Sequence, residues 1–201
     1  MNKLTARDLI NCGVFSIIYF IIMYASGMIG MAGPAFIFVG GALSILINGI
    51  VVMLYLSRVP KFGALTITSL LIALLMGITH GTPHVVVTSV LTGLIADAIQ
   101  SRLGKATSLE PRRGLVAYAV FSLWSFGMYL PALLNPESYF GLVAQGWGAD
   151  YAEGLKVMFS PGVISVWMVV TFLLALLGGY VGQRALRRHF ERAGVSQLGV
   201  Q

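Results

Sequence analysis

Long apolar stretches alternate with short polar or turn-forming stretches along the whole chain. Each apolar stretch holds about 20 residues, enough for a helix to cross a hydrocarbon layer roughly 30 Å thick. The pattern therefore predicts six transmembrane helices, at residues 9–31, 34–57, 62–79, 83–101, 115–134 and 161–183.

Capping and turn residues indicate where two of these helices begin. Thr82 and Ser160 are capping residue types, and each is followed by a proline, Pro83 or Pro161. Proline suits the first helical position because its missing N–H would be unpaired there anyway.

The composition agrees with a chain embedded in a membrane. Of the 201 residues, 57% are hydrophobic and 10% are charged, whereas soluble domains carry about 25% charged residues. We therefore expect an all-α integral membrane protein with one domain over residues 1–201 and a basic cytoplasmic tail at 184–201. Cys12 is the only cysteine, so no internal disulfide forms.

The basic residues predict the orientation of the helices. If the N-terminus is inside the cell, 12 of the 13 Lys and Arg residues fall on the inner side, and only Lys156 falls outside. Basic segments next to membrane helices stay in the cytoplasm, so both termini are expected there. This explains the net charge of +6 without a nucleic-acid partner. The inner residues are Lys3, Arg7, Arg58, Lys61, Arg102, Lys105, Arg112, Arg113, Arg184, Arg187, Arg188 and Arg192.

The connection at 135–159 is the one long loop, and it lies on the predicted outer side. Loops of this length are usually functional or disordered, and its spread of aromatic residues argues against disorder. Residues 150–159 predict a short amphipathic helix, with Tyr151, Leu155 and Met158 on one side. Two interpretations stay open: a helix lying on the membrane surface, or a lid over an outward-facing pocket.

Asp97 is the only carboxylate within a predicted span. Ionisable groups in membranes are often functional, which suggests proton coupling. The alternative is a structural pair with a basic residue at the inner surface, such as Arg58 or Arg112.

His80 and His84 flank an outer turn and lie four residues apart. This spacing suits a metal or a haem iron on a continuous helix, but Pro83 interrupts the helix between them. The alternative is two interfacial histidines at a turn between helices.

The sequence predicts an outward-facing pocket under the 135–159 loop rather than an enzyme. It contains no nucleotide P-loop, no zinc-protease or serine-hydrolase motif and no cluster of acidic ligands, so we expect no catalytic residue, cofactor or resident metal. Aromatic side chains supply contact area and a few polar groups orient a ligand. The candidate substrate-binding residues are His80, His84, Trp124, Tyr129, Asn135, Trp147 and Tyr151.

Small residues predict two kinds of close packing. Gly13 and Ser16 in the first helix, with Gly41 and Ser44 in the second, are candidates for docking a partner helix. The glycines of the last helix, including Gly178 and Gly182, are expected to pack inside the protein.

Several short motifs resemble the substrate-binding S components of energy-coupling factor (ECF) transporters, most closely the Trep_Strep family, also labelled MptD-type. They are the runs at 3–10 (KLTARDLI), 93–97 (GLIAD), 178–182 (GGYVG) and 188–194 (RHFERAG). The resemblance spans the whole chain. Many S components carry an A-x-x-x-A docking pattern on the first helix, and here only Gly13 and Ser16 stand in its place.

The resemblance implies a substrate-capture subunit in the cytoplasmic (inner) membrane of a bacterium. Such subunits bind a vitamin or similar micronutrient from outside and dock on a T component driven by two ATPases. His80 and His84 prompt haem or another metal chelate as a further substrate class. The alternatives are a stand-alone secondary transporter, proton-coupled through Asp97, and a membrane scaffold without a ligand.

Overall fold

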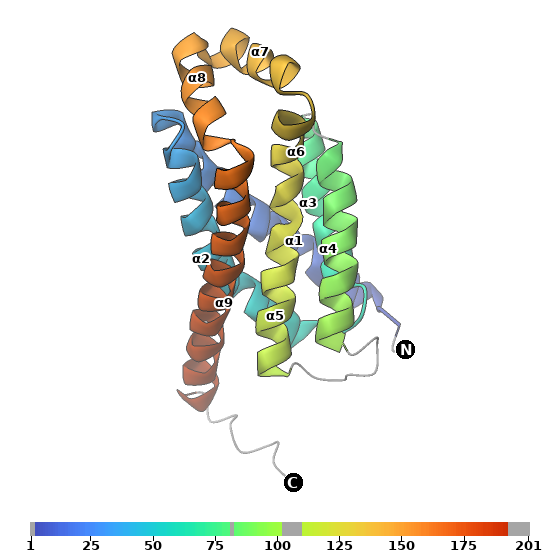
Figure 1. Cartoon of the computed structure of the whole chain (residues 1–201). Coiled ribbons are helices and arrows are strands. Elements are labelled where there is room, and N and C mark those ends of the chain that lie inside the picture. Colours follow the sequence, from blue (N-terminus) through green and yellow to red (C-terminus); the bar gives the residue numbers. More distant parts are fainter. Residues whose placement is uncertain (1–2, 81–82, 102–109, 193–201) are drawn as a thin grey trace.

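The computed structural model describes residues 3–80, 83–101 and 110–192, and every regular element within them is a helix (Figure 1). Two of these elements are short 3₁₀ helices, η1 (Met28–Ala32) and η2 (Leu123–Ser125). The α-helices are α1 (Ala6–Gly27), α2 (Phe36–Arg58), α3 (Ala64–His80), α4 (His84–Ser101), α5 (Pro111–Ser122), α6 (Phe126–Leu134), α7 (Pro136–Trp147), α8 (Ala149–Met158) and α9 (Pro161–Arg192).

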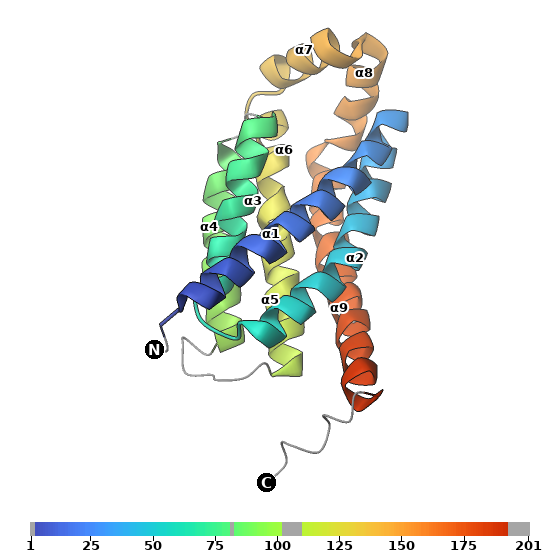
Figure 2. The same ribbon diagram turned by 180° about the vertical axis from the view of Figure 1, so that it is seen from behind.

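The long helices stand side by side, and two short helices cross one end of the bundle. The start of α1 and the end of α9 lie at the opposite end of the bundle from α7 and α8, which define the α7–α8 end (Figure 1). Helix α1 runs obliquely across the bundle (Figure 2) and packs against both α2 and α3. The C-terminal part of α1 thereby lies near the α7–α8 end (Figure 2).

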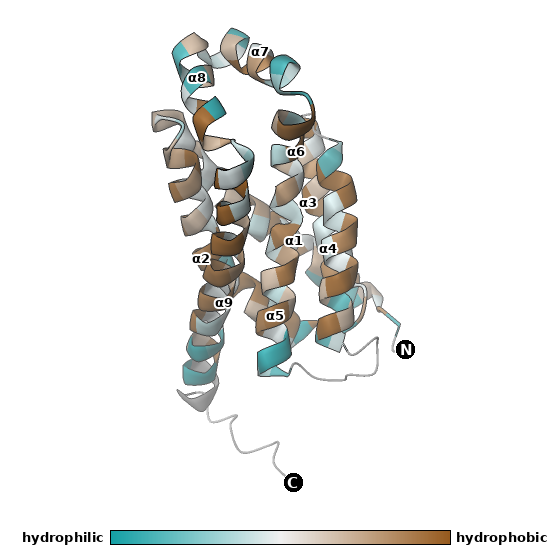
Figure 3. Ribbon diagram, viewed as in Figure 1, coloured by the Kyte–Doolittle hydropathy of each residue, from teal (hydrophilic) through white to brown (hydrophobic). Residues whose placement is uncertain are grey.

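Among the described residues, five segments are long and apolar enough to cross a membrane by length and composition. Charged and polar residues gather at both ends of the bundle, and apolar residues cover its middle (Figure 3). The third predicted span, 62–79, corresponds to α3, Ala64–His80, within which the described side chains form an apolar stretch at Ala64–Ile78. The all-α fold is confirmed, while six spans and the cytoplasmic termini stay predictions. The five long segments are Ala6–Ala32, Phe36–Arg58, His84–Ser101, Pro111–Leu134 and Pro161–Arg188.

The fifth predicted helix, at 115–134, is divided by η2 into α5 and α6 and begins earlier, at Pro111. The hydroxyl of Thr88 on α4 donates to the carbonyl of Trp124 at 2.9 Å, so this carbonyl has a partner from another helix at the point of interruption. The sixth predicted helix also extends past 183, because α9 continues to Arg192.

The 135–159 connection contains two helices where the sequence predicted one. The predicted helix at 150–159 is confirmed as α8. Helix α7 was missed, although its start carries a clear signal: Pro136 is its first residue and the Asn135 side chain accepts from the Ser138 N–H at 3.4 Å. Gly148 separates the two helices with φ +91°, a conformation that L side chains rarely adopt.

Helices α2 and α9 meet through glycines without side chains between them. A Cβ atom added to Gly49 would overlap the backbone of Gly178. One added to Gly182 would lie 2.7 Å from the carbonyl oxygen of Gly49. The prediction that Gly178 and Gly182 pack inside the protein is therefore confirmed.

Candidate ligand-binding site

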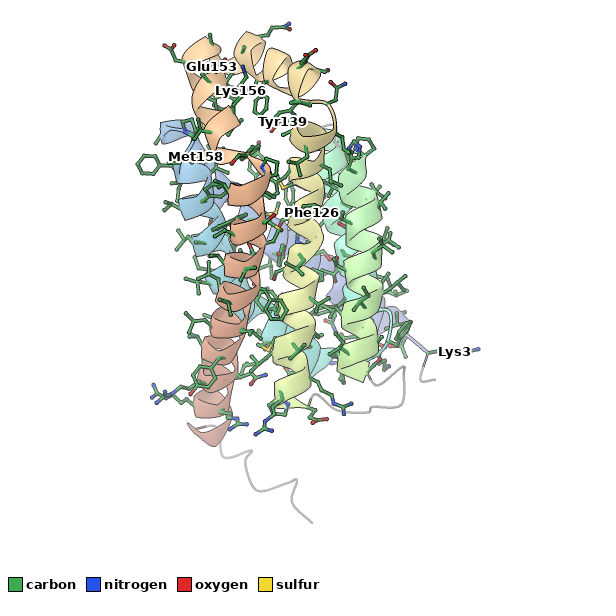
Figure 4. All side chains as sticks on the ribbon, viewed as in Figure 1. Lys3, Phe126, Tyr139, Glu153, Lys156 and Met158 are labelled. Atoms are coloured by element: carbon green, nitrogen blue, oxygen red, sulfur yellow. The ribbon has the colours of Figure 1, made fainter. Side chains whose placement is uncertain are left out.

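A cavity of about 390 Å³ lies at the α7–α8 end, bordered by α1, η1, α2, α6 and α9 and covered by α7 and α8. This volume falls within the range of roughly 300–1,000 Å³ that small-molecule sites occupy. The side chain of Tyr139, a residue of α7, lies beneath that helix (Figure 4) and contributes to the cover of the cavity. Segments far apart in the sequence, from Tyr19 to Trp167, thus enclose one space.

Aromatic rings form much of the cavity wall, and they brace one another. The rings of Tyr129 and Phe159 meet edge to face with centroids 5.0 Å apart, and those of Trp147 and Tyr151 stack at 5.5 Å. Such pairs hold large apolar surfaces in fixed orientations. The aromatic lining residues are Tyr19, Tyr24, Trp124, Tyr129, Tyr139, Trp147, Tyr151, Phe159 and Trp167.

Hydrogen bonds hold the deep side of the cavity in place. The indole N–H of Trp124 donates to the hydroxyl of Tyr19 at 3.2 Å. The amide of the fully buried Asn48 donates to the Tyr19 carbonyl at 3.4 Å and to the Ser44 hydroxyl at 3.3 Å. In these bonds the hydroxyls of Tyr19 and Ser44 act as acceptors, so each retains an O–H that can donate to a ligand.

Helix α8 contacts both η1 and the turn that follows it. The hydroxyl of Tyr151 donates to the carbonyl of Gly30 at 3.0 Å. A Cβ atom added to Gly154 would lie 2.9 Å from the ring of Pro34, so the helix and the turn approach closely. Tyr151 and Leu155 of α8 line the cavity, and both interpretations of the long loop, a lid and a helix on the membrane surface, stay predictions.

The family comparison covers almost the whole chain, because a family described as hypothetical bacterial integral membrane proteins, Trep_Strep, matches residues 6–192. The chain belongs to the Trep_Strep family. Comparison of this family member with curated proteins and with solved structures returns no match. The membership confirms a bacterial integral membrane protein with several apolar helices.

Four of the seven predicted substrate-binding residues of this Trep_Strep chain line the cavity: Trp124, Tyr129, Trp147 and Tyr151. Two of the other three, Asn135 and His84, lie outside the described lining. Asn135 is exposed and caps α7. His84 begins α4, outside the lining, and its buried Nδ1 atom has no hydrogen-bond partner. The side chain of His80 lies outside the described residues.

No group of three or more His, Cys, Asp or Glu residues that could hold a metal occurs in the part of the chain that the structure describes.

Sequence analysis missed the contribution of the first predicted helix to the cavity. Tyr19 and Met23 on α1, with Met28 and Met31 on η1, all line it, and Trp167 on α9 lies opposite. The available signal was the concentration of methionines near the end of that helix. Methionine side chains are flexible and are overused at adaptable binding surfaces.

The predicted docking face on the first two helices is largely internal, which corrects the expectation. The hydroxyl of the buried Ser16 donates to the Cys12 carbonyl at 2.6 Å. Gly41 and Ser44 line the cavity, and a Cβ atom on Gly41 would lie 2.9 Å from the Trp167 ring. Of the two glycines among the four predicted residues, only Gly13 leaves an added Cβ atom without a neighbour within 4 Å.

Asp97 caps the start of α3 from the neighbouring helix α4. Its fully buried carboxylate accepts from the Leu65 N–H at 3.0 Å, the Thr66 N–H at 2.8 Å and the Thr66 hydroxyl at 2.6 Å. These N–H groups have no partner within α3, and the helix dipole favours an anion at this point. Among the described residues, neither Arg58 nor Arg112 forms the predicted ion pair with Asp97.

The motif at 3–10, like the motif at 93–97 that contains Asp97, has a structural explanation, which lies at the start of α1. The Thr5 side chain and Asp8 form a reciprocal capping box, and Lys61 pairs with Asp8 at 2.6 Å. The beginning of α1 is thereby tied to the link between α2 and α3.

Proposed function

We propose that the protein is the substrate-capture (S) subunit of an ECF-type ABC importer in the cytoplasmic membrane of a bacterium. The observation that carries the proposal is the cavity of about 390 Å³, walled by aromatic side chains and covered by α7 and α8. A covered cavity of this size suits the capture of one vitamin-like micronutrient, because closure excludes water and slows escape.

The proposed topology has six spans, with both termini in the cytoplasm and the cavity facing outward. It is supported by the distribution of basic residues and by the start of α1 and the end of α9 lying opposite α7 and α8 (Figure 1). The sequence has no nucleotide-binding motif. The energy for transport therefore comes from partners, a T component and two ATPases, and the chain itself is not an enzyme.

We propose that α1 contributes to the surface for the T component around Gly13. This residue leaves room for a neighbouring helix, and the large apolar side chains of Ile10, Val14 and Ile17 are exposed beside it. Gly13→Leu is expected to weaken co-purification of the T component. Gly77→Leu is the matched control, because a Cβ atom at Gly77 on α3 also meets nothing within 4 Å. Equal loss of the partner in both variants would remove α1 from the proposal.

The decisive experiment is native mass spectrometry of the gently purified protein, expressed in the bacterium that encodes it. The expected spectrum contains complexes with a T component and two ATPases, and a small molecule released on unfolding. A lone chain without partners or small molecule would instead favour a membrane scaffold.

Proteoliposome uptake separates the proposal from a proton-coupled transporter. The lone protein is expected to give no uptake of the released molecule under a pH gradient. The position of the Asp97 carboxylate on the N–H groups of α3 supports a structural role for it. Uptake driven by a pH gradient and abolished by Asp97→Asn would contradict the proposal.

A further inference from the structure

The described residues that line the cavity include no charged side chain. Among them, none is Asp, Glu, Lys, Arg or His. A charge moved into such a site loses its hydration and finds no opposite charge, which is costly. The attraction of aromatic faces for a cation is smaller than the cost of desolvating an ion, so the cavity discriminates against ions of either sign.

The covering helices do carry charges, but they place them elsewhere. Glu137 on α7 and Glu153 and Lys156 on α8 border a separate open hollow, of about 560 Å³, that shares no residue with the cavity. Glu153 and Lys156 lie above the level of Tyr139 (Figure 4). The aromatic residues Tyr139, Trp147 and Tyr151 thus lie on the face of α7 and α8 toward the cavity, and the charged residues lie away from it.

The entrance is as apolar as the interior. The exposed lining residues are Tyr24, Gly27, Met28 and Met31 near the end of α1 and Trp147 on α7, whereas Tyr19, Trp124 and Trp167 are buried. Flexible methionines at the entrance can follow the outline of a flat ring. The rings behind them offer stacking surfaces.

We infer that the cavity takes an uncharged ligand with a planar aromatic body and only a few hydrogen-bonding groups. The hydroxyls of Tyr19 and Ser44 supply donors for those groups. This inference specifies the substrate class of the proposed function. It rests on the proposed function only in taking the cavity as the binding site. A haem or another chelate with free carboxylates falls outside this ligand class.

Three probes with one ring system and different charges test the inference: 2-naphthaleneethanol, which is neutral, 2-naphthylacetate, an anion, and 2-(2-naphthyl)ethylamine, a cation at neutral pH. Binding is measured by equilibrium dialysis against buffer with the same detergent micelles, so that partitioning into micelles cancels. The alcohol is expected to bind about a hundredfold or more tightly than either ion.

A charge placed at the entrance provides a second, independent measurement. Met28→Lys is expected to raise the affinity for 2-naphthylacetate roughly fivefold. Val157→Lys is the matched control, because Val157 is also an exposed apolar residue near the α7–α8 end but does not line the cavity. In this control the order of the three probes is expected to stay unchanged.

The inference is overturned if the wild-type protein binds the carboxylate or the amine as tightly as the alcohol. It is also overturned if the folded protein binds none of the three up to their solubility limits. Neither result bears on whether the protein forms a complex with a T component and ATPases. Conversely, selective binding of the alcohol by a protein without such partners would contradict the proposed function and keep the ligand class.

Discussion

Replacement of Gly182 by alanine tests the close contact between α9 and α2. Gly182 lies on α9 against α2, and an added Cβ atom would be 2.7 Å from the Gly49 carbonyl oxygen and 2.8 Å from the Ile50 Cα atom. Both neighbours are backbone atoms, which move only when the helix moves. Ordinary contacts begin at 3.4 Å, so the shortfall is 3.4 − 2.7 = 0.7 Å.

The expected cost follows from separating two helices that are packed along their length. A gap of about 0.5–1 Å forfeits a quarter to a half of each affected van der Waals contact, and overpacking typically costs about 1–3 kcal/mol. Alanine is also a better helix former than glycine by about 0.5–1 kcal/mol. The matched variant Gly77→Ala shares that gain without the clash, because its Cβ atom meets nothing within 4 Å.

The difference between the two variants therefore isolates the packing term. We expect Gly182→Ala to have a free energy of unfolding about 1–3 kcal/mol below that of Gly77→Ala. SDS-induced unfolding in mixed micelles, followed by circular dichroism, measures both. If the two variants agree within about 0.5 kcal/mol, the direct backbone contact between α2 and α9 does not hold.

Three further predictions concern the buried carboxylate, the cavity and the topology. Asp97→Ala should lower the free energy of unfolding by about 1–3 kcal/mol in the same assay, because N–H groups of α3 lose their acceptor, and a wild-type value would contradict the capping role. Tyr129→Ala, assayed on folded protein, should weaken binding of 2-naphthaleneethanol roughly thirtyfold, and unchanged affinity would place the ligand elsewhere. In a Cys12→Ser background, Trp147→Cys should react with an impermeant thiol reagent on intact cells and Arg187→Cys should not; the reverse pattern would invert the topology.

The local sequence determined the helical architecture and part of the cavity. Uninterrupted apolar runs of about 20 residues form helices because the backbone must satisfy its own hydrogen bonds in lipid. Trp147 and Tyr151 line the cavity, and the long aromatic loop next to helix ends that contains them is itself a local signal. The division at η2 escaped prediction. One reason for the division is the hydrogen bond from the Thr88 hydroxyl to the Trp124 carbonyl, which joins two different helices.

Only the tertiary structure decided which face of each helix is internal. In a soluble protein, polar residues mark the outer face of a helix, but in a membrane protein the residues facing lipid and those facing the core are both apolar. Periodicity therefore did not show that Gly41 and Ser44 face the cavity rather than a partner. Nor did it show that the oblique course of α1 brings Met28 to the same cavity as Trp147. These contacts depend on how each helix is tilted and rotated against its neighbours, which is settled by packing over the whole bundle.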